Sequence, residues 1–217
     1  MKTVIFDMDG LIVDSEVRAL KAWREVAEKR GIPGIDELFP KMIGMNVYTR
    51  GLLFAETFGE DFPFLECDNE VRSIAHGYEA ISPVPLKKGV RELLAYLREN
   101  GFKIAIASSG LLATIERRMK HHGIFEYFDV IVSGDMVTKS KPDPEIFLLC
   151  AEKLGVHPSE ITVFEDSQNG IKAAHAAGMR PVMVPDLVTP EKDVAAMAYA
   201  ICSSLLEVKE KYESGSL

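Results

Sequence analysis

The sequence predicts an α/β protein, built on a parallel sheet with helices on both faces and carrying an inserted helical domain. From about residue 88 onward, short apolar runs alternate with longer amphipathic segments, which is the pattern of strands and helices in turn. Each run is apolar throughout, as in strands that are buried on both faces. Roughly a hundred residues separate the first run from the second, whereas one strand–helix–strand unit needs only about thirty. The excess indicates the insertion.

The first strand is predicted at Thr3–Phe6, a short apolar run that ends in acidic residues. A helix at Glu16–Arg30 follows, because apolar residues recur there at helical spacing and Gly31 provides a stop. Up to about Ser82 the sequence then shows further helical segments and no convincing strand. These segments are Asp36–Phe39, Val47–Phe58 and Asn69–Ile81, with Pro40, Gly44 and Gly59 between them.

A linker is predicted at residues 83–85, where two prolines hold the chain extended. After it, helices and strands alternate regularly. We therefore expect a core domain of residues 1–14 plus 83–217 and a helical cap domain of residues 15–82. The predicted strands are Lys103–Ala107, Asp129–Val132, Ile161–Phe164 and Pro181–Val184, and the predicted helices are Lys88–Asn100, Leu112–His122, Pro144–Leu154, Ser167–Ala177 and Ser203–Tyr212.

The composition excludes several classes of function. Of 217 residues, 25 are basic and 33 acidic, for a net charge of −8, so a nucleic-acid or anionic-membrane partner is not expected. Cys67, Cys150 and Cys202 are widely spaced, which argues against a disulfide framework and a structural zinc site. The sequence shows neither a signal segment nor an apolar run of membrane-spanning length. We expect a cytoplasmic protein.

Acidic residues follow two of the predicted strands. Asp7 and Asp9 come directly after the first strand, and Glu165 and Asp166 come after the strand at Ile161–Phe164. Ligands of open parallel sheets bind at the carboxyl ends of the strands, so these four carboxylates are expected to converge. They would repel one another without a cation, and oxygen ligands of this kind suit Mg²⁺.

Groups that suit an anion follow the other strands. Ser108 and Ser109 end the strand at Lys103–Ala107 and offer hydroxyl and backbone N–H groups near a helix start. Lys141 follows the strand at Asp129–Val132 and supplies a local positive charge in an acidic protein. The sequence therefore predicts a site for a metal ion together with a phosphate-like anion.

Simpler roles for some of these residues stay open. Asp14, Ser15 and Ser167 are equally suited to capping the helices that follow them. A calcium-binding loop at Asp7 is excluded, because Gly10 falls at the fourth loop position rather than the sixth and because a strand, not a helix, precedes the loop.

Taken together and in order, these motifs resemble the haloacid dehalogenase superfamily, and the helical insert is similar to the cap of its phosphatase and β-phosphoglucomutase branch. The resemblance covers nearly the whole core domain. It implies a Rossmann-like parallel sheet with helices on both faces, an inserted all-helical cap and a monomer. The residues that carry it are Asp7, Asp9, Gly10, Asp14, Ser15, Ser108, Lys141, Pro142, Glu165, Asp166, Ser167, Gly170, Ala173 and Ala174.

The resemblance also implies roles for these residues. Asp7 would attack phosphorus as the nucleophile, and Asp9 would act as general acid and then general base. Mg²⁺ would be held by Asp7, the backbone carbonyl of Asp9 and Asp166, with Glu165 in or near its shell. Ser108 would bind the phosphoryl group with Ser109 nearby, and Lys141 would neutralise it.

The choice between hydrolase and mutase depends on the cap. The histidine and the phosphate-binding arginine of β-phosphoglucomutase are matched here by Ala19 and Val47, so a phosphomonoesterase acting on a small phosphate ester, such as a sugar phosphate, is predicted and a sugar phosphomutase is the alternative. Substrate contacts are expected from Gly44, Asn46 and Arg50 in the cap and from Ser109, with Arg72 and His76 as further candidates. A phospho-accepting receiver is the alternative from another class; the insert and Asp9 argue against it.

Overall fold

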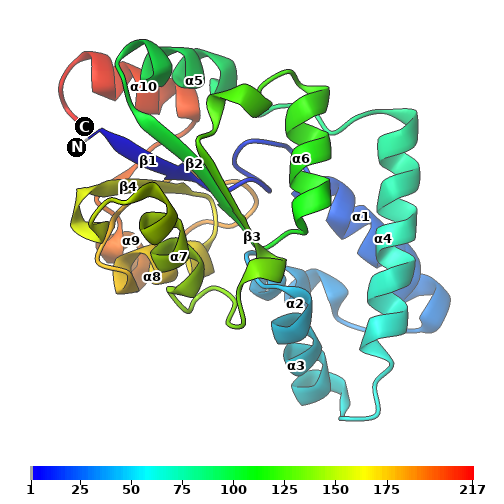
Figure 1. Ribbon diagram of the computed structural model, residues 1–217. Helices are drawn as coiled ribbons and strands as arrows, with labels where there is room; N and C mark the ends of the chain where they lie inside the picture. Colours follow the sequence, from blue (N-terminus) through cyan, green and yellow to red (C-terminus); the bar gives the residue numbers. More distant parts are fainter. Residues whose placement is uncertain (1) are drawn as a thin grey trace.

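The computed structural model describes residues 2–217. Met1, the first residue of the predicted core domain, lies outside the described residues. In this part of the chain six strands form one parallel sheet, which confirms the predicted fold class (Figure 1). The strand order is β3-β2-β1-β4-β5-β6. The strands are β1 (Thr3–Phe6), β2 (Lys103–Ser108), β3 (Val130–Ser133), β4 (Ile161–Glu165), β5 (Arg180–Met183) and β6 (Ala200–Ile201).

Strand β1 lies in the middle of the sheet, between β2 and β4. Its side chains alternate between the two faces, as the pleat requires. Val4 and Phe6 pack into the apolar core on one face, whereas Ile5 packs into the core on the other. The carboxyl ends of β1, β2 and β4 consequently lie side by side.

Helices cover both faces of the sheet (Figure 1). The face of Phe6 is covered by helices α5, α6 and α10, and the face of Ile5 by α7 and α8. The short helix α9 packs beside α8. The bounds are α5 (Val90–Glu99), α6 (Leu112–His121), α7 (Glu145–Leu154), α8 (Gln168–Ala176), α9 (Lys192–Met197) and α10 (Leu205–Glu213), with short 3-10 turns at Phe125–Tyr127, Gly134–Met136 and Pro158–Glu160.

Four helices between β1 and α5 form the helical insert, which extends from Glu16 to Ile81 and packs around an apolar core of its own. At its centre the ring of Trp23 stacks on that of Phe54, with the ring centroids 5.0 Å apart. The helices are α1 (Glu16–Arg30), α2 (Ile35–Met42), α3 (Val47–Phe58) and α4 (Phe64–Ile81).

Two elements of the insert extend beyond the predicted bounds. Helix α2 continues through Pro40 to Met42, although proline was expected to end it. Its buried residues, which include Leu38 and Phe39, pack into the core of the insert and hold the helix together against the lost backbone hydrogen bond. Helix α4 begins five residues before the predicted start, because the buried side chain of Phe64 anchors its first turn. Among the described residues, no helix combines the length and apolar character that a bilayer crossing requires.

Candidate active site

The site lies where the carboxyl ends of the central strands meet. Asp7 directly follows β1, and its backbone N–H donates to the carbonyl of Phe164 on β4 over 3.0 Å. Glu165 ends β4 and Asp166 follows it. Because of this register, side-chain oxygens of Asp7, Glu165 and Asp166 all lie within 4.8 Å of one another, and all three residues are buried. Three of the four carboxylates that were predicted to converge therefore do so, and Asp9 is not part of this group.

Lys141 is fully buried against two of these acids. Its ammonium group lies 2.6 Å from Oδ1 of Asp7, contacts the carboxylate of Glu165 and donates to the carbonyl oxygen of Ala107. Burial alone would lower the pKa of Lys141, but the two carboxylates outweigh burial and raise it. Lys141 is therefore a permanently charged partner of Asp7.

Glu165 is held rigidly from both sides. Lys141 contacts one carboxylate oxygen, and the other accepts hydrogen bonds from the backbone N–H and the hydroxyl of Ser167, at 2.8 and 2.9 Å. Ser167 also caps α8, since its hydroxyl oxygen accepts from the N–H of Gly170, which was one of the roles left open for it. Both oxygens of Glu165 are thus already bonded to protein groups, so Glu165 supports the cluster from behind.

The cluster fits a divalent cation. Burial, reinforced by neighbouring acids, raises the pKa of Asp166, and burial also raises the pKa of Asp7 to about 8 despite Lys141. Three buried carboxylates against one ammonium group therefore call for another positive charge. A further buried oxygen, Oδ2 of Asp186, has no hydrogen-bond partner among the described residues. Carboxylate oxygens are the donor set that Mg²⁺ prefers, so the residues of the cluster fit this ion.

Asp9 has a different environment from the cluster. Its Oδ1 atom accepts hydrogen bonds from the hydroxyl of Ser15 and from Nη1 of Arg118, both at 2.5 Å. Ser15 precedes α1 but makes no side-chain cap, so the capping role considered for it is wrong. Asp14 instead lies 3.4 Å from the ammonium group of Lys87.

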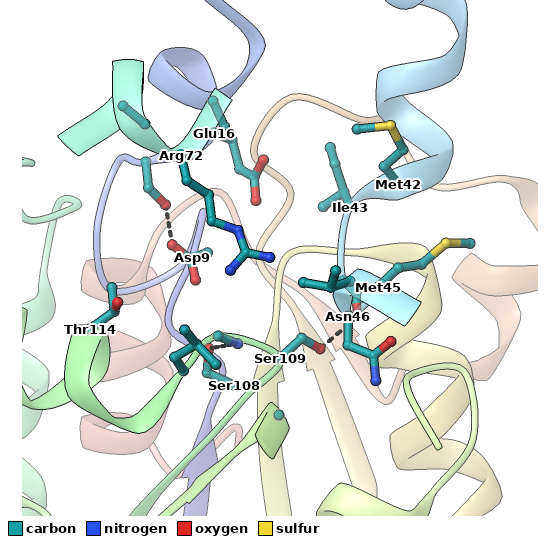
Figure 2. A pocket seen from close by; sticks show the side chains of 18 of the residues that line it. Asp9, Glu16, Met42, Ile43, Met45, Asn46, Arg72, Ser108, Ser109 and Thr114 are labelled. Carbon is teal, nitrogen blue, oxygen red and sulfur yellow. Dashed lines mark hydrogen bonds between the residues drawn. The ribbon is translucent and has the colours of Figure 1, made fainter. Parts of the chain in front are cut away.

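A cavity of about 440 Å³ connects this cluster with the helical insert. Asp7, Asp9, Ser108 and Asp166 line its floor, whereas Lys141 and Glu165 lie behind them and do not line it. All of these floor residues, together with Ser109, Asn46 and Met45, line the cavity, and Figure 2 shows Asn46 and Met45 across the view from Asp9. The predicted contact residues Ser109, Gly44, Asn46 and Arg50 all line the cavity.

Two arginines of the insert share one buried acid beside the cavity. Nη2 of Arg50 lies 2.9 Å from Oδ1 of Asp68, and Nε of Arg72 lies 2.7 Å from Oδ2 of the same residue. Asp68 is only 2% exposed. Asp68 therefore orients the two guanidinium groups, and that of Arg72 reaches into the cavity (Figure 2).

The loop between α2 and α3, residues 43–46, is docked onto the core by backbone hydrogen bonds, and we call it the docked loop. Ser109 donates to the carbonyl oxygen of Gly44 over 2.7 Å, and Asn169 donates to that of Ile43 over 3.0 Å. The backbone N–H of Asn46 donates to the hydroxyl oxygen of Ser140 over 2.7 Å. Ser109 follows Ser108, Ser140 precedes Lys141, and Asn169 lies three positions after Asp166, so the loop is anchored next to the cluster. Gly44 is required, because a Cβ there would lie 2.8 Å from Oγ of Ser167.

Sequence reasoning missed three residues that line the cavity and one that lies beside Asp166. Glu16 lines it, and burial, reinforced by Asp9 and Asp7, raises the pKa of Glu16 to about 8. Arg118 and Glu79 meet at the seam between core and insert. Asp186 could have been predicted, because it too follows the end of a predicted strand. The other three residues lie on helices, where their spacing is that of an ordinary polar surface.

Comparison with known proteins identifies the family. The sequence model of a protein family, described as haloacid dehalogenase-like hydrolase, matches residues 1–178. The chain belongs to this family. It is 35% identical over 188 residues to a phosphorylated carbohydrates phosphatase of Thermotoga maritima, covering 84% of each chain, and 32% identical over 205 residues to a β-phosphoglucomutase of Bacillus subtilis, covering 87% of this chain and 88% of that one. The predicted family and a hydrolase-class enzyme are thereby confirmed.

A solved structure extends the similarity to three dimensions. The crystal structure of CbbY from Rhodobacter sphaeroides, in complex with phosphate, superimposes with a TM-score of 0.80 at 26% identity, covering 96% of each chain. The similarity therefore includes the helical insert as well as the sheet.

Proposed function

We propose that this hydrolase is a Mg²⁺-dependent phosphomonoesterase that acts on a small phosphorylated metabolite, a sugar phosphate, through an aspartyl-phosphate. The observation that carries the proposal is the contact between Asp7 and Lys141, with Asp166 beside them and Asp9 on the same cavity. A carboxylate can attack an anionic phosphate only where its surroundings neutralise both partners.

In the first half-reaction the carboxylate of Asp7 attacks phosphorus, forming a P–O bond to the enzyme while the bond to the leaving oxygen breaks. Asp9 gives its proton to that oxygen, so the alcohol leaves neutral. In the second half-reaction Asp9 takes a proton from water, which attacks the phosphorus and releases inorganic phosphate and free Asp7. A bound Mg²⁺ would supply positive charge to the phosphoryl oxygens, held by Asp7 and Asp166.

Two other groups prepare the site. Lys141 is buried and charged, so it can stabilise the carboxylate of Asp7 before attack and offset charge in the phosphoryl group afterwards. The hydroxyl of Ser108 lines the cavity floor and accepts from the N–H of Gly110 over 3.1 Å, which leaves its own hydrogen for a phosphoryl oxygen.

The upper part of the cavity supports a substrate that carries hydroxyl groups. Arg50, Arg72 and Asn46 supply donors, and Glu16 supplies a carboxyl group, while Trp23 and other apolar residues of the insert complete the wall. Alternating donors and acceptors beside apolar surface suit a sugar. The relative from Thermotoga maritima bears a name that points to the same substrate class.

The decisive experiment is turnover of p-nitrophenyl phosphate with Mg²⁺ and with EDTA, followed by a screen of sugar phosphates. We expect multiple turnovers with Mg²⁺ and none with EDTA. Labelling by at most one equivalent of phosphoryl group, without turnover, would instead identify a phospho-accepting receiver.

A sugar phosphomutase is the second candidate, because a named β-phosphoglucomutase is among the relatives. Ala19 and Val47 occupy the positions at which the mutase is expected to need a histidine and an arginine. Incubation with β-glucose 1-phosphate and a trace of the 1,6-bisphosphate separates the two activities. We expect free phosphate to appear faster than glucose 6-phosphate, and the reverse order would favour the mutase.

A further inference from the structure

Arg118, on the core helix α6, contacts both Asp9 and the helical insert. Its Nη1 atom lies 2.5 Å from Oδ1 of Asp9, and its Nη2 atom pairs with the carboxylate of Glu79 on α4. The side chains of Arg118 and Glu79 are 14% and 6% exposed, so the ion pair is largely withdrawn from solvent. One guanidinium group therefore connects the insert directly to the proposed acid.

Two arginines of α6 bind Glu79. Besides Arg118, the guanidinium group of Arg117 lies 2.6 Å from it, but the side chain of Arg117 is 51% exposed. Burial would raise the pKa of Glu79, yet the two guanidinium groups outweigh it and lower that pKa. Glu79 is therefore an ionised acceptor that engages Nη2 of Arg118.

The two carboxylate oxygens of Asp9 have different surroundings. Oδ1 accepts from both Ser15 and Arg118. Oδ2 lies on the side of the phosphate-binding residues, since a Cβ placed on Gly110 would lie 3.7 Å from Oδ2 and 3.3 Å from the hydroxyl of Ser108. Oδ2 is thus the oxygen that faces the position of a bound phosphate ester.

A guanidinium group readily binds both oxygens of a carboxylate with two parallel N–H donors. Such a grip on Asp9 would occupy Oδ2 as well as Oδ1. Here the two-donor contact does not form, because Glu79 engages Nη2 and, of the two terminal nitrogens, only Nη1 binds Asp9, while Nε has no hydrogen-bond partner among the described residues.

We infer that Arg118 is a positioning residue for Asp9, and that Glu79 keeps Oδ2 of Asp9 free by binding Nη2 of Arg118 while Nη1 binds Oδ1 of Asp9. This inference rests on the proposed role of Asp9. Withdrawal of Glu79, by mutation or by movement of the insert, lets Arg118 bind both oxygens and blocks the acid.

The test compares two aryl phosphates of similar shape, phenyl phosphate and p-nitrophenyl phosphate, with Mg²⁺ present. Phenolate is the more basic leaving group and depends more on protonation, so a misplaced acid slows phenyl phosphate selectively. For Glu79→Gln we expect kcat on phenyl phosphate to fall about tenfold more than kcat on p-nitrophenyl phosphate, within the roughly 10²–10⁴ that general acids contribute.

Arg117→Gln is the matched control, because it removes a partner of Glu79 without touching Asp9. We expect it to change both substrates equally and by less than about threefold, as for an exposed ion pair. In the double variant Glu79→Gln with Arg118→Leu, the substrate ratio should equal that of Arg118→Leu alone, because Glu79 acts on Asp9 only through the guanidinium group. Equal effects of Glu79→Gln on the two substrates, or strictly additive effects in the double variant, overturn the inference.

A second pair of variants applies even where Glu79→Gln fails to fold. Arg118→Lys keeps one donor for Oδ1 and cannot bind both oxygens, so the substrate ratio should stay within about threefold of wild type. Arg118→Leu removes the donor and should shift the ratio about tenfold. Identical ratios in the two variants refute the positioning role. Wild-type turnover with no such pattern overturns only this inference, whereas absence of wild-type turnover overturns the proposed function with it.

Discussion

Gly170 on α8 lies against the buried carboxylate of Glu165, and Gly170→Ala tests how rigidly that carboxylate is held. A Cβ at position 170 would lie 1.9 Å from Cδ and from Oε1 of Glu165. Ordinary van der Waals contact begins near 3.4 Å, so the carboxylate must retreat by about 1.5 Å. That retreat breaks its contacts with Lys141 and Ser167.

The free-energy change follows from two opposing effects. Alanine is favoured over glycine in a helix by at most about 1 kcal/mol. Overpacking costs about 1–3 kcal/mol, and breaking a buried ion pair about 3–5 kcal/mol. We therefore expect Gly170→Ala to lower the free energy of unfolding by about 3 kcal/mol or more, which for a chain of this size lowers Tm by about 6–12 °C.

Gly77 on α4 provides the matched control. It is also a helical glycine, but a Cβ there meets nothing within 4 Å. Gly77→Ala should therefore raise the free energy of unfolding by about 0.5–1 kcal/mol. Urea unfolding followed by circular dichroism measures both variants. A Gly170→Ala protein as stable as wild type would refute the reasoning, because it would show that Glu165 moves freely.

Three further outcomes are expected. Asp7→Asn should reduce turnover about a thousandfold or more, because an amide is not a nucleophile, while circular dichroism shows an intact fold; near-normal kcat would exclude Asp7 as the nucleophile. Lys141→Met should destabilise the protein by about 3–5 kcal/mol in urea unfolding, since two buried carboxylates lose their cation, and added Mg²⁺ should restore part of the loss; unchanged stability in EDTA would contradict this. The pKa of Glu16 is raised from 4.5 to about 8 in the folded protein, so its contribution to stability is complete below pH 4.5 and is lost as the pH rises toward 8. In EDTA, Tm should therefore fall less between pH 6 and 9 in Glu16→Gln than in wild type. The same fall in Tm for both proteins would contradict the raised pKa of Glu16.

The sequence was sufficient to predict the sheet and the cluster, because both depend on strand ends. Once β1 is placed in a parallel sheet, the residues after its last apolar position must lie at the same edge as those after β4, and Asp7 and Asp166 follow from that geometry. The site within the sheet is thus encoded locally, in short runs followed by acids.

The contacts between core and insert could not be predicted in this way. Arg118 and Glu79 are 39 positions apart on two helices, and each looks like an ordinary solvated residue in its own helical pattern. Their meeting depends on how the insert lies against α6, which periodicity does not determine. The two-residue strand β6 was missed for a different reason, since two residues are too few to show alternation.

The docked loop has a consequence for how such an enzyme can change its preferences. Its bonds to Ser109, Ser140 and Asn169 engage only main-chain atoms of the loop. The side chain of Met45 is therefore free to vary while the anchoring persists, whereas that of Asn46 also caps α3 by accepting from the N–H of Thr49 over 3.0 Å. A library randomised at Met45, with Asn46 limited to residues that cap helices, should retain folded members with altered selectivity, which makes the loop a natural starting point for laboratory evolution.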